Sequence, residues 1–407
     1  MSRLKHDVVI VGAGMVGLSL ANSLADLPLS IALIETQAIP DLNQDSDNPT
    51  DWNTQDYALR VSAISPASQQ VLQQAGAWDA IQCRRVSAYQ RMHIWEQAPQ
   101  ALESLKFSAE ELEVDALGWI IENRLIRASL YAAAQTHNNI HFYSPQCVQA
   151  IEVTGKQVNL DLDFGQALQT RLLVAADGAN SHTRHMLDLP EVSRSYAQSG
   201  VVTRLTPKKP HQACAYQRFH AQEVLGILPL ANGDCSMVWS CSDARAESLL
   251  KLSKTDLSHK VSEFSQGILG QMRVNAEVKK FPLQLLHSRQ YVSERVVLCG
   301  DAAHAVHPLA GQGVNLGLAD VSALSDALHA AWSKNLDLGD LSVLRSYERQ
   351  RKHINVRMMS GLDALLDIFQ SENPLVQQGR RLGMGLVNRI GPIKRILMQQ
   401  AMGLKNL

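Results

Sequence analysis

Three glycines near the start of the chain, Gly12, Gly14 and Gly17, follow the spacing G-x-G-x-x-G. Between a strand and a helix, the first glycine allows a tight turn, the second lets a pyrophosphate approach the backbone, and the third allows close helix packing. The helix that begins there directs free N–H groups and a partial positive charge at the phosphates. Glu35 stands 18 residues after Gly17, where a carboxylate can accept hydrogen bonds from an adenosine ribose. This segment predicts a dinucleotide site, although it does not distinguish FAD from NAD.

A second segment contains the pair Asp177-Gly178, directly after the apolar stretch 173–176 and before Ser181 and Arg184. One interpretation is a capped turn at the start of a helix, because Asp, Gly and Ser are typical of turns and caps. The other is a second part of the cofactor site. We favour the cofactor site because a third segment with matching chemistry follows.

The third segment runs from Gly300-Asp301 to a glycine-rich turn at 311–313. Asp301 follows an apolar strand, so its carboxylate can hydrogen-bond a sugar-like chain. The turn opens a helix whose unpaired N–H groups can face an anion, such as the negative charge of a reduced flavin. His304 and His307 are three residues apart, but zinc sites need a larger ligand set, and we predict no metal site.

The apolar pattern predicts the elements that position these segments. The chain opens with a β-α-β unit formed by strand 7–11, helix 15–27 and strand 31–35. Between Thr36 and Arg60 lies a polar stretch that is long for a connection, and we interpret it as a surface insertion.

Later parts of the chain divide into two kinds of pattern. Beyond the opening β-α-β unit, helices are expected at 64–82 and 121–136, and strands at 140–154, 157–163, 171–176 and 295–298. The stretch 196–241 is strand-like and interrupted by turn residues, as in an antiparallel sheet. After Gly313 the pattern is helical throughout.

The composition excludes some classes of protein. Lys plus Arg number 38 and Asp plus Glu 39, which argues against a nucleic-acid binder with a globally basic surface. The six cysteines are scattered without a C-x-x-C pair, which is typical of reduced thiols in the cytoplasm. No apolar stretch approaches the roughly 18 residues that a membrane span needs. We therefore expect a cytoplasmic protein that binds no nucleic acid.

Together, the three motifs resemble those of the class A flavoprotein aromatic hydroxylases, the p-hydroxybenzoate hydroxylase-like group. The marks of this group are G-x-G-x-x-G, an Asp-Gly pair, and a Gly-Asp pair followed by proline and a glycine-rich helix start, and all occur here in order. Three segments are similar to the ubiquinone-biosynthesis hydroxylases: 59–65, 300–317 and 347–349. Shorter segments resemble the 2-polyprenylphenol hydroxylase branch in particular: 219–220, 228–230, 238–240 and 400–404.

The resemblance implies an α/β fold with three parts. These are a Rossmann-like FAD-binding domain of the p-hydroxybenzoate hydroxylase type, a second, mostly antiparallel β substrate domain, and a helical C-terminus. The discontinuous FAD-binding domain is expected at 1–80, 115–190 and 285–345. The substrate domain is expected at 81–114 and 191–284, and the C-terminal helical region at 346–407.

The resemblance also assigns roles to residues. By it, Glu35 holds the adenosine ribose, Arg60 the pyrophosphate region and Asp301 the ribityl chain. Gly313 and Val314 face the flavin ring.

Two further residues are expected at the cofactor. Asn123 stands where many relatives have Arg or Gln, and Asp177 is linked in the family to cofactor or nicotinamide handling. The full set of expected cofactor-binding residues is Gly12, Gly14, Gly17, Glu35, Arg60, Asn123, Asp177, Gly178, Asp301, Pro308, Gly311, Gly313, Val314 and Asn315.

The activity that the resemblance implies is that of a FAD-dependent monooxygenase. It would bind FAD non-covalently, use molecular oxygen, and take electrons from NADPH or NADH. A flavin C4a-hydroperoxide would hydroxylate the ring of a polyprenylated phenol or quinol in ubiquinone biosynthesis. Because the cofactor carries this step, no amino-acid nucleophile is required. The catalytic residues are unknown; His304 and His307 are candidates for a base by position, and their alternative role is capping or packing beside the cofactor.

A polyprenyl tail raises a delivery problem, because exposing ten tail carbons to water costs on the order of 8 kcal/mol. The segment 374–407 holds no Asp or Glu, and its basic residues are Arg380, Arg381, Arg389, Lys394, Arg395 and Lys405. Apolar residues lie among them at roughly helical spacing: Leu382, Leu386, Ile390, Ile393, Leu397 and Met398. One hypothesis is that this region docks on the inner membrane or on a ubiquinone-biosynthesis complex. The alternative is a C-terminal helix packed on the FAD domain.

Other functions stay open at the level of sequence. Sister enzymes of the pathway share these motifs, so the ring position is not specified, and neither are the direct electron donor and the oligomeric state. The same fold also serves other FAD monooxygenases and epoxidases, and a non-catalytic FAD-fold protein could escort prenyl groups. The intact segment 311–317, which serves a flavin ring, favours an enzyme over an escort.

Overall fold

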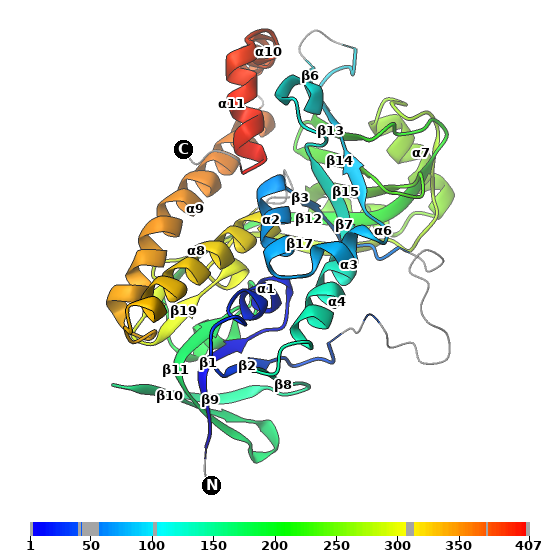
Figure 1. Cartoon of the computed structure of the whole chain (residues 1–407). Helices are drawn as coiled ribbons and strands as arrows, with labels where there is room; N and C mark the ends of the chain where they lie inside the picture. Colours follow the sequence, from blue (N-terminus) through cyan, green and yellow to red (C-terminus); the bar gives the residue numbers. More distant parts are fainter. Residues whose placement is uncertain are drawn as a thin grey trace.

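The computed structural model describes residues 3–39, 42, 57–100, 104–306, 313–371 and 373–403. It contains two large β-sheets, a small three-stranded sheet, and long C-terminal helices along one side (Figure 1). Most of the surface insertion expected between Thr36 and Arg60 lies outside the described residues.

The first large sheet has eight strands and a parallel centre. The strands are β1 (Leu4–Val11), β2 (Ile31–Ile34), β8 (Ile140–Tyr143), β9 (Val148–Thr154), β10 (Gln157–Leu162), β11 (Ala167–Ala175), β18 (Val292–Ser293) and β19 (Val296–Leu298). Its main path runs β18-β19-β11-β1-β2-β8, and the pairs from β19 to β8 are all parallel. Parallel strands end at the same edge, so this sheet brings the loops after β1, β11 and β19 together. Those loops carry the three sequence motifs.

Both faces of this sheet are covered, as a parallel sheet requires. The helices in its first core include α1 (Met15–Ser23), α2 (Pro66–Gln74), α3 (Trp78–Gln82), α4 (Asn123–Ala134) and α8 (Gly313–Ser333), together with the start of α9, described below. Val8 and Ile10 of β1 belong to that core, whereas Val9 and Val11 share a second core with the hairpin of β9 and β10. The alternation follows from the two-residue period of a strand.

The second large sheet has nine strands and is mostly antiparallel. They are β5 (Arg91–Trp95), β6 (Leu105–Ser108), β12 (Glu191–Pro207), β13 (Cys214–His220), β14 (Glu223–Pro229), β15 (Cys235–Ser242), β16 (Met272–Val274), β17 (Lys279–Ser288) and β20 (His304–Ala305). Only β13 and β5 pair in parallel among these strands as described. Helices α6 (Asp243–Leu250) and α7 (Lys254–Phe264) close a core around Trp239, which is fully buried.

A small sheet of β3 (Val61–Ile64), β4 (Ser87–Tyr89) and β7 (Gly118–Glu122) completes the β structure. After β3, the single helix expected at 64–82 is wrong, because the chain forms α2 and α3 instead. Gly76 lies between them with a φ of +70°, a left-handed conformation that ends a helix. The strand expected at 140–154 is also divided, into β8 and β9, and Pro145 lies in the break.

The C-terminal part consists of α9 (Leu341–Gln370), α10 (Pro374–Arg389) and α11 (Gly391–Ala401). Helix α9 packs against α8 and extends to the nine-stranded sheet (Figure 1). There Phe369, near the end of α9, stacks on Phe219 with ring centroids 4.0 Å apart. Within the described segments, no helix is both long enough and apolar enough to cross a membrane.

The architecture confirms the expected α/β fold with a second, antiparallel sheet and a helical C-terminus. The nine-stranded sheet draws on 91–108 and 191–288, so β17 crosses the domain boundary expected at 284/285. Strand β20, which follows the Gly300-Asp301 motif, also pairs with β17. The two sheets therefore meet where the cofactor motif is located.

Candidate cofactor and substrate site

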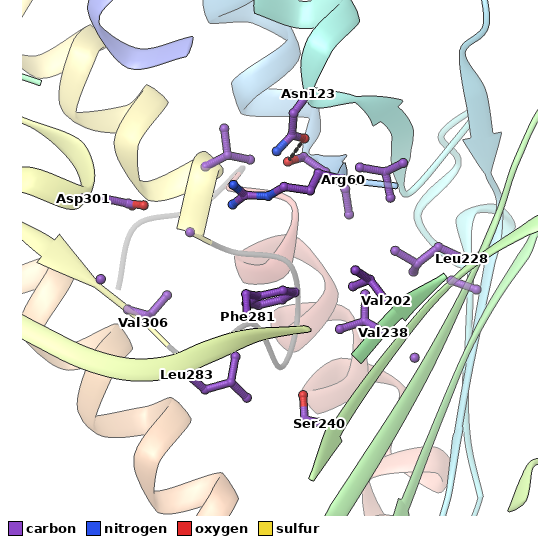
Figure 2. Close-up of a pocket in the computed structure, with 18 of the residues that line it drawn as sticks. Arg60, Asn123, Val202, Leu228, Val238, Ser240, Phe281, Leu283, Asp301 and Val306 are labelled. Carbon is purple, nitrogen blue, oxygen red and sulfur yellow. Dashed lines mark hydrogen bonds between the residues drawn. The ribbon is translucent and has the colours of Figure 1, made fainter. Parts of the chain in front are cut away.

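A cavity of about 840 Å³ lies between the motif-bearing edge of the first sheet and the nine-stranded sheet. Figure 2 shows Asp301 and Leu228 at opposite ends of this cavity, with the ring of Phe281 between them. Arg60 and Asn123 lie along one side. The cavity thus has one end at the cofactor motifs and another at the strands of the second sheet.

The glycine loop after β1 has the geometry that a phosphate cradle needs. Gly12 has a φ of +104°, and a Cβ there would lie 2.5 Å from the carbonyl oxygen of Ala176. A Cβ at Gly17 would lie 1.9 Å from the carbonyl oxygen of Gly12, so the backbones of the helix and the loop are in direct contact. At Gly14, which lines the cavity, a Cβ would meet nothing within 4 Å. Two glycines are therefore required by the protein itself, and the third leaves open space for a ligand.

Glu35 lies directly after β2 and is bound to the glycine loop. Its Oε2 accepts hydrogen bonds from the backbone N–H of Ala13 at 3.1 Å and from Arg127 at 2.9 Å. Arg127, on α4, also donates to the carbonyl oxygen of Ala13 at 2.7 Å. The sequence reasoning missed Arg127. Its signal was present, because it stands one helical turn after Asn123 on a helix that packs beside α1.

Arg60 and Asn123 line the same stretch of the cavity. The backbone N–H of Asn123 donates to the carbonyl oxygen of Arg60 at 3.0 Å, and its side-chain oxygen accepts from the Ser62 hydroxyl at 2.7 Å (Figure 2). The structure therefore brings these two predicted residues together. Arg60 is a cation at the cavity wall, as a pyrophosphate would require.

Asp177 is occupied within its own turn. Its carboxylate accepts the Ser181 hydroxyl at 2.5 Å and the backbone N–H of Thr183 at 3.0 Å, at the start of α5 (His182–Met186). Gly178, with a φ of +85°, lines the cavity. The pair therefore combines the two interpretations: the Asp side chain caps the turn, and the Gly backbone faces the cavity.

Arg184 connects this turn to the third motif. It is 1% exposed, and it donates to the carbonyl oxygens of Ala179 at 2.9 Å and Ala302 at 2.8 Å. It also pairs with Glu191. The sequence marked Arg184 as part of a motif without a role, and the structure places it between two loops that face the cavity.

Asp301 lies at the cavity wall in the 3-10 turn Gly300–Ala302. Asp301 is exposed to the cavity, but the surrounding protein desolvates its carboxyl group and raises its pKa despite the nearby His304 and Arg60. A hydroxyl-bearing chain would relieve that desolvation by donating hydrogen bonds. This fits the predicted role of Asp301 toward a ribityl chain.

Behind the turn lies a fully buried group of charges. Asp320 of α8 accepts the Gly300 N–H at 3.1 Å, His304 Nε2 at 2.5 Å, and Arg351 of α9 at 2.8 Å. Asn355 donates to it at 3.2 Å. Burial alone would raise the pKa of Asp320, but its interactions with His304 and Arg351 outweigh burial and lower it. His304 therefore packs beside the cofactor motif, which favours the alternative to a catalytic base.

The start of α8 faces the cavity through Gly313 and Val314. Asn315, predicted beside them, instead uses its side chain to join α8 to β3, accepting from Ser65 N–H at 3.0 Å and donating to the Ala63 oxygen at 2.8 Å. The predicted residues His307, Pro308 and Gly311 lie outside the described residues. No cluster of three or more His, Cys, Asp or Glu that could hold a metal occurs in the described part of the chain.

The far end of the cavity is largely apolar. Apolar residues that line the cavity include Met92, Phe107, Leu117, Val202, Val224, Leu228 and Val238, with Phe281 midway and Leu283 and Val306 nearer Asp301. Polar residues that line the cavity away from the cofactor motifs include Tyr89, Tyr216, Gln217, Ser240, Lys279 and Lys280. Burial raises the pKa of Tyr89 to about 12, so its hydroxyl keeps its proton near neutral pH. The sequence did not identify these residues, because they come from strands far apart in the chain.

Helix α11 supplies part of the cavity wall with Leu397, Met398 and Ala401, and Met402 follows directly after it. It is fixed by Lys394, which pairs with Glu111 at 2.6 Å, and α10 is fixed by Arg380, which pairs with Glu96. Both carboxylates belong to the substrate side of the molecule. The alternative expectation is a C-terminal helix packed on the FAD domain. It is wrong for the main contacts of α10 and α11, which are with residues beside the second sheet.

These residues fit FAD. The open space at Gly14 accepts a pyrophosphate, Arg60 offers a cation, Asp301 offers an acceptor for a sugar-like chain, and the N-terminus of α8 faces the cavity. Glu35 and Arg127 both bond Ala13 of the glycine loop, where an adenosine could lie beside them. The chain can thus hold one end of the cofactor at the β1 loop and its ring beside Gly313.

Comparison with known proteins agrees with this geometry. A family model described as FAD binding domain matches residues 5–361. The chain is 33% identical over 404 residues to the 3-demethoxyubiquinol 3-hydroxylase of Escherichia coli (strain K12), covering 99% of this chain and 100% of that protein. It is 32% identical over 441 residues to the mitochondrial ubiquinone biosynthesis monooxygenase COQ6 of Homo sapiens, covering 97% and 92%.

Among solved structures, p-nitrophenol 4-monooxygenase PnpA from Pseudomonas putida DLL-E4 superposes with a TM-score of 0.78 at 17% identity, covering 99% of both chains. At that identity the likeness concerns the fold alone. Fold and site together define a FAD-dependent monooxygenase of class A. Within that class, the chain belongs to the ubiquinone-biosynthesis hydroxylases, as its similarity to these enzymes over nearly its whole length shows.

Proposed function

We propose that this enzyme hydroxylates the aromatic ring of a polyprenylated phenol or quinol in ubiquinone biosynthesis. In this proposal, molecular oxygen is the co-substrate and NADPH or NADH is the electron donor. The observation that carries it is the single cavity that runs from Asp301 to an apolar end at Leu228 and α11. A cavity with a polar cofactor end and a long apolar end suits an aromatic head with a hydrocarbon tail.

Bound FAD supplies the redox chemistry and the activation of oxygen. The protein binds and orients. In this proposal Arg60 and the glycine loop would hold the phosphates, Asp301 would accept hydrogen bonds from the ribityl chain, and Gly313 and Val314 would face the ring.

The substrate ring would lie near Phe281, between the start of α8 and the second sheet. Apolar side chains exclude water there, and Tyr89, Gln217 and Ser240 offer hydrogen bonds that orient ring hydroxyls. Of the described residues that line the cavity, Asp301 is the only carboxylate and none is a histidine. Orientation and water exclusion are therefore the main contributions of this chain, and a role for His307 stays a prediction.

The test combines two measurements. Deleting the gene should cause one quinone precursor to accumulate, and its identity defines the ring position. The purified FAD-loaded enzyme should then oxidise reduced nicotinamide faster in the presence of that precursor, and the product should carry one oxygen atom from labelled O₂ on its ring. Oxygen found on an alkene of the tail would support an epoxidase instead. Absence of stimulation by any phenol or quinol would contradict the proposal.

A further inference from the structure

The last two helices carry rows of exposed apolar side chains on their outer faces. On α10, Leu375, Leu382 and Leu386 are seven and four residues apart, so they lie on one side of the helix, and they are 77%, 69% and 57% exposed. On α11, Ile393 and Leu397 are four residues apart and are also exposed. A helix packed only as part of a globular surface would bear polar residues at these positions.

The exposed apolar side chains are clustered in the C-terminal helices. In the described part of the chain, 14 large hydrophobic side chains are exposed, and nine of them lie between Val356 and Leu397. Single exposed apolar residues are ordinary, but a gathered set marks an interaction surface. We call the outer sides of α10 and α11, with Leu375, Leu382, Leu386, Ile393, Ile396 and Leu397, the apolar face.

The charges around the apolar face are basic. The chain has no Asp or Glu after residue 373. Arg380 pairs with Glu96 and Lys394 with Glu111, so these two cations do not contribute to the charge around the apolar face. Arg389 stands three residues after Leu386 on the same side of α10 and is exposed, as is Arg395 on α11. Apolar side chains flanked by exposed arginines complement acyl chains and the phosphate groups of anionic lipids.

The same helix connects this face with the cavity. Met398 and Met402 are buried and line the cavity, on the inner side of α11. Leu397 is 42% exposed and lines the cavity as well. Leu397 therefore belongs both to the apolar face and to the cavity wall, so α11 joins the two.

We propose that α10 and α11 dock on an anionic phospholipid bilayer, and that the hydrocarbon tail of the substrate enters the cavity past Leu397. The identity of that tail rests on the proposed function. The docking does not, because it follows from the apolar face and its arginines.

The experiment uses the full FAD-loaded chain and vesicles without substrate. Vesicles of phosphatidylcholine with phosphatidylglycerol are compared with vesicles of phosphatidylcholine alone in sedimentation assays. The variant Leu382→Gln/Leu386→Gln changes residues of α10 outside the described cavity lining. The matched control, Val153→Gln/Leu336→Gln, changes two other exposed apolar residues far along the chain from this face.

We expect the wild type to bind the anionic vesicles and the Leu382/Leu386 variant to bind at least roughly tenfold more weakly, with the control unchanged. Arg389→Gln should weaken binding to anionic vesicles and reduce its salt dependence. Bound flavin and the unfolding temperature of each variant report whether the fold is intact.

Equal binding by the Leu382/Leu386 variant, or no binding by the wild type, overturns the proposal. A wild-type dimer that these substitutions dissociate, without vesicle binding, would assign the face to a second copy. Loss of co-purification with other quinone-synthesis enzymes, without vesicle binding, would assign it to a protein complex. A chain that binds vesicles but hydroxylates no phenol or quinol contradicts the proposed function alone.

Discussion

Gly14 and Gly17 belong to the same loop but differ in what surrounds them. Gly17 lies against the backbone of Gly12, so its lack of a side chain is required for the protein to fold. Gly14 borders open cavity, so its lack of a side chain matters for whatever occupies that space. One motif therefore contains a packing residue and a ligand residue, and substitution can separate them.

We predict that Gly14→Ala leaves the FAD-free protein as stable as the wild type, or more stable by about 0.4–1 kcal/mol, because alanine restricts the unfolded chain. Its affinity for FAD should fall by roughly tenfold or more, since the new methyl group occupies the phosphate position. Gly17→Ala should destabilise the protein even without FAD, at the upper end of the about 1–3 kcal/mol that overpacking costs. Chemical unfolding of the FAD-free proteins and fluorescence titration with FAD measure both effects. Equal loss of stability in the two variants would contradict this account.

At the scale of elements, α9 holds the Gly300-Asp301 turn in place from behind. Tyr347 donates to the carbonyl oxygen of Leu298 at 3.0 Å, and Glu348 accepts the backbone N–H of Tyr291 at 2.9 Å. One turn further, Arg351 reaches Asp320, which in turn accepts the Gly300 N–H. Sequence alone assigned no role to Tyr347 and Glu348, although they lie in a segment similar to the family. In the structure they bind the backbone just before the cofactor turn.

We predict that Arg351→Met lowers the free energy of unfolding by about 3–5 kcal/mol at neutral pH, because it removes one of the two cationic partners of the fully buried Asp320. Lys352→Met, at the next position of α9 but far more exposed, is the control and should cost less than about 1 kcal/mol. FAD affinity should fall with the first variant, since the turn that bears Asp301 loses its support.

The pH dependence gives a second check of the same contact. A carboxylate whose pKa is lowered by folding adds stability above its unfolded value, here 3.8, and loses that contribution as pH falls through its folded value. The difference in free energy of unfolding between the wild type and the Arg351→Met variant should therefore be largest near neutral pH and should become smaller below about pH 4. Urea unfolding at several pH values measures it, and a difference that grows toward acid would refute the assignment.

At the scale of the whole molecule, the cavity belongs to neither large sheet alone. The first sheet contributes loops at its edge, the second contributes strand faces, and α11 closes part of the wall. Helix α9 runs from one region to the other, as its contacts with Asp320 and Phe219 show. A ligand that fills the cavity would join these parts.

We predict that FAD stabilises the whole chain by about 2.7 kcal/mol at one hundred times its dissociation constant, because it binds only the folded form. Riboflavin, which lacks the pyrophosphate and adenosine, should stabilise less at the same concentration. Thermal unfolding of the FAD-free protein during titration with each compound provides the measurement. If riboflavin were as effective as FAD, the glycine loop, Glu35 and Arg127 would have no part in binding.

Features that depend on neighbours along the chain could be predicted from the order of residues. The glycine spacing at 12–17, the pairs Asp177-Gly178 and Gly300-Asp301, and the alternation of strands and helices follow from local backbone requirements. From them the fold class, the FAD site and the enzyme family were predictable. They could not place Arg127, Arg184 or Arg351, because those side chains find their partners across many residues of sequence.

Which side chains share the cavity, and which have partners elsewhere, could be seen only in the folded chain. Asn315 and His304 have the residue types of a binding site, but their partners are Ser65 and Asp320. The basic residues of the C-terminus were equivalent in sequence, and among those that the structure describes, Arg380 and Lys394 turn inward. The physical reason is that a side chain's role depends on the groups that burial brings to it, and those groups come from strands and helices whose proximity no local pattern specifies.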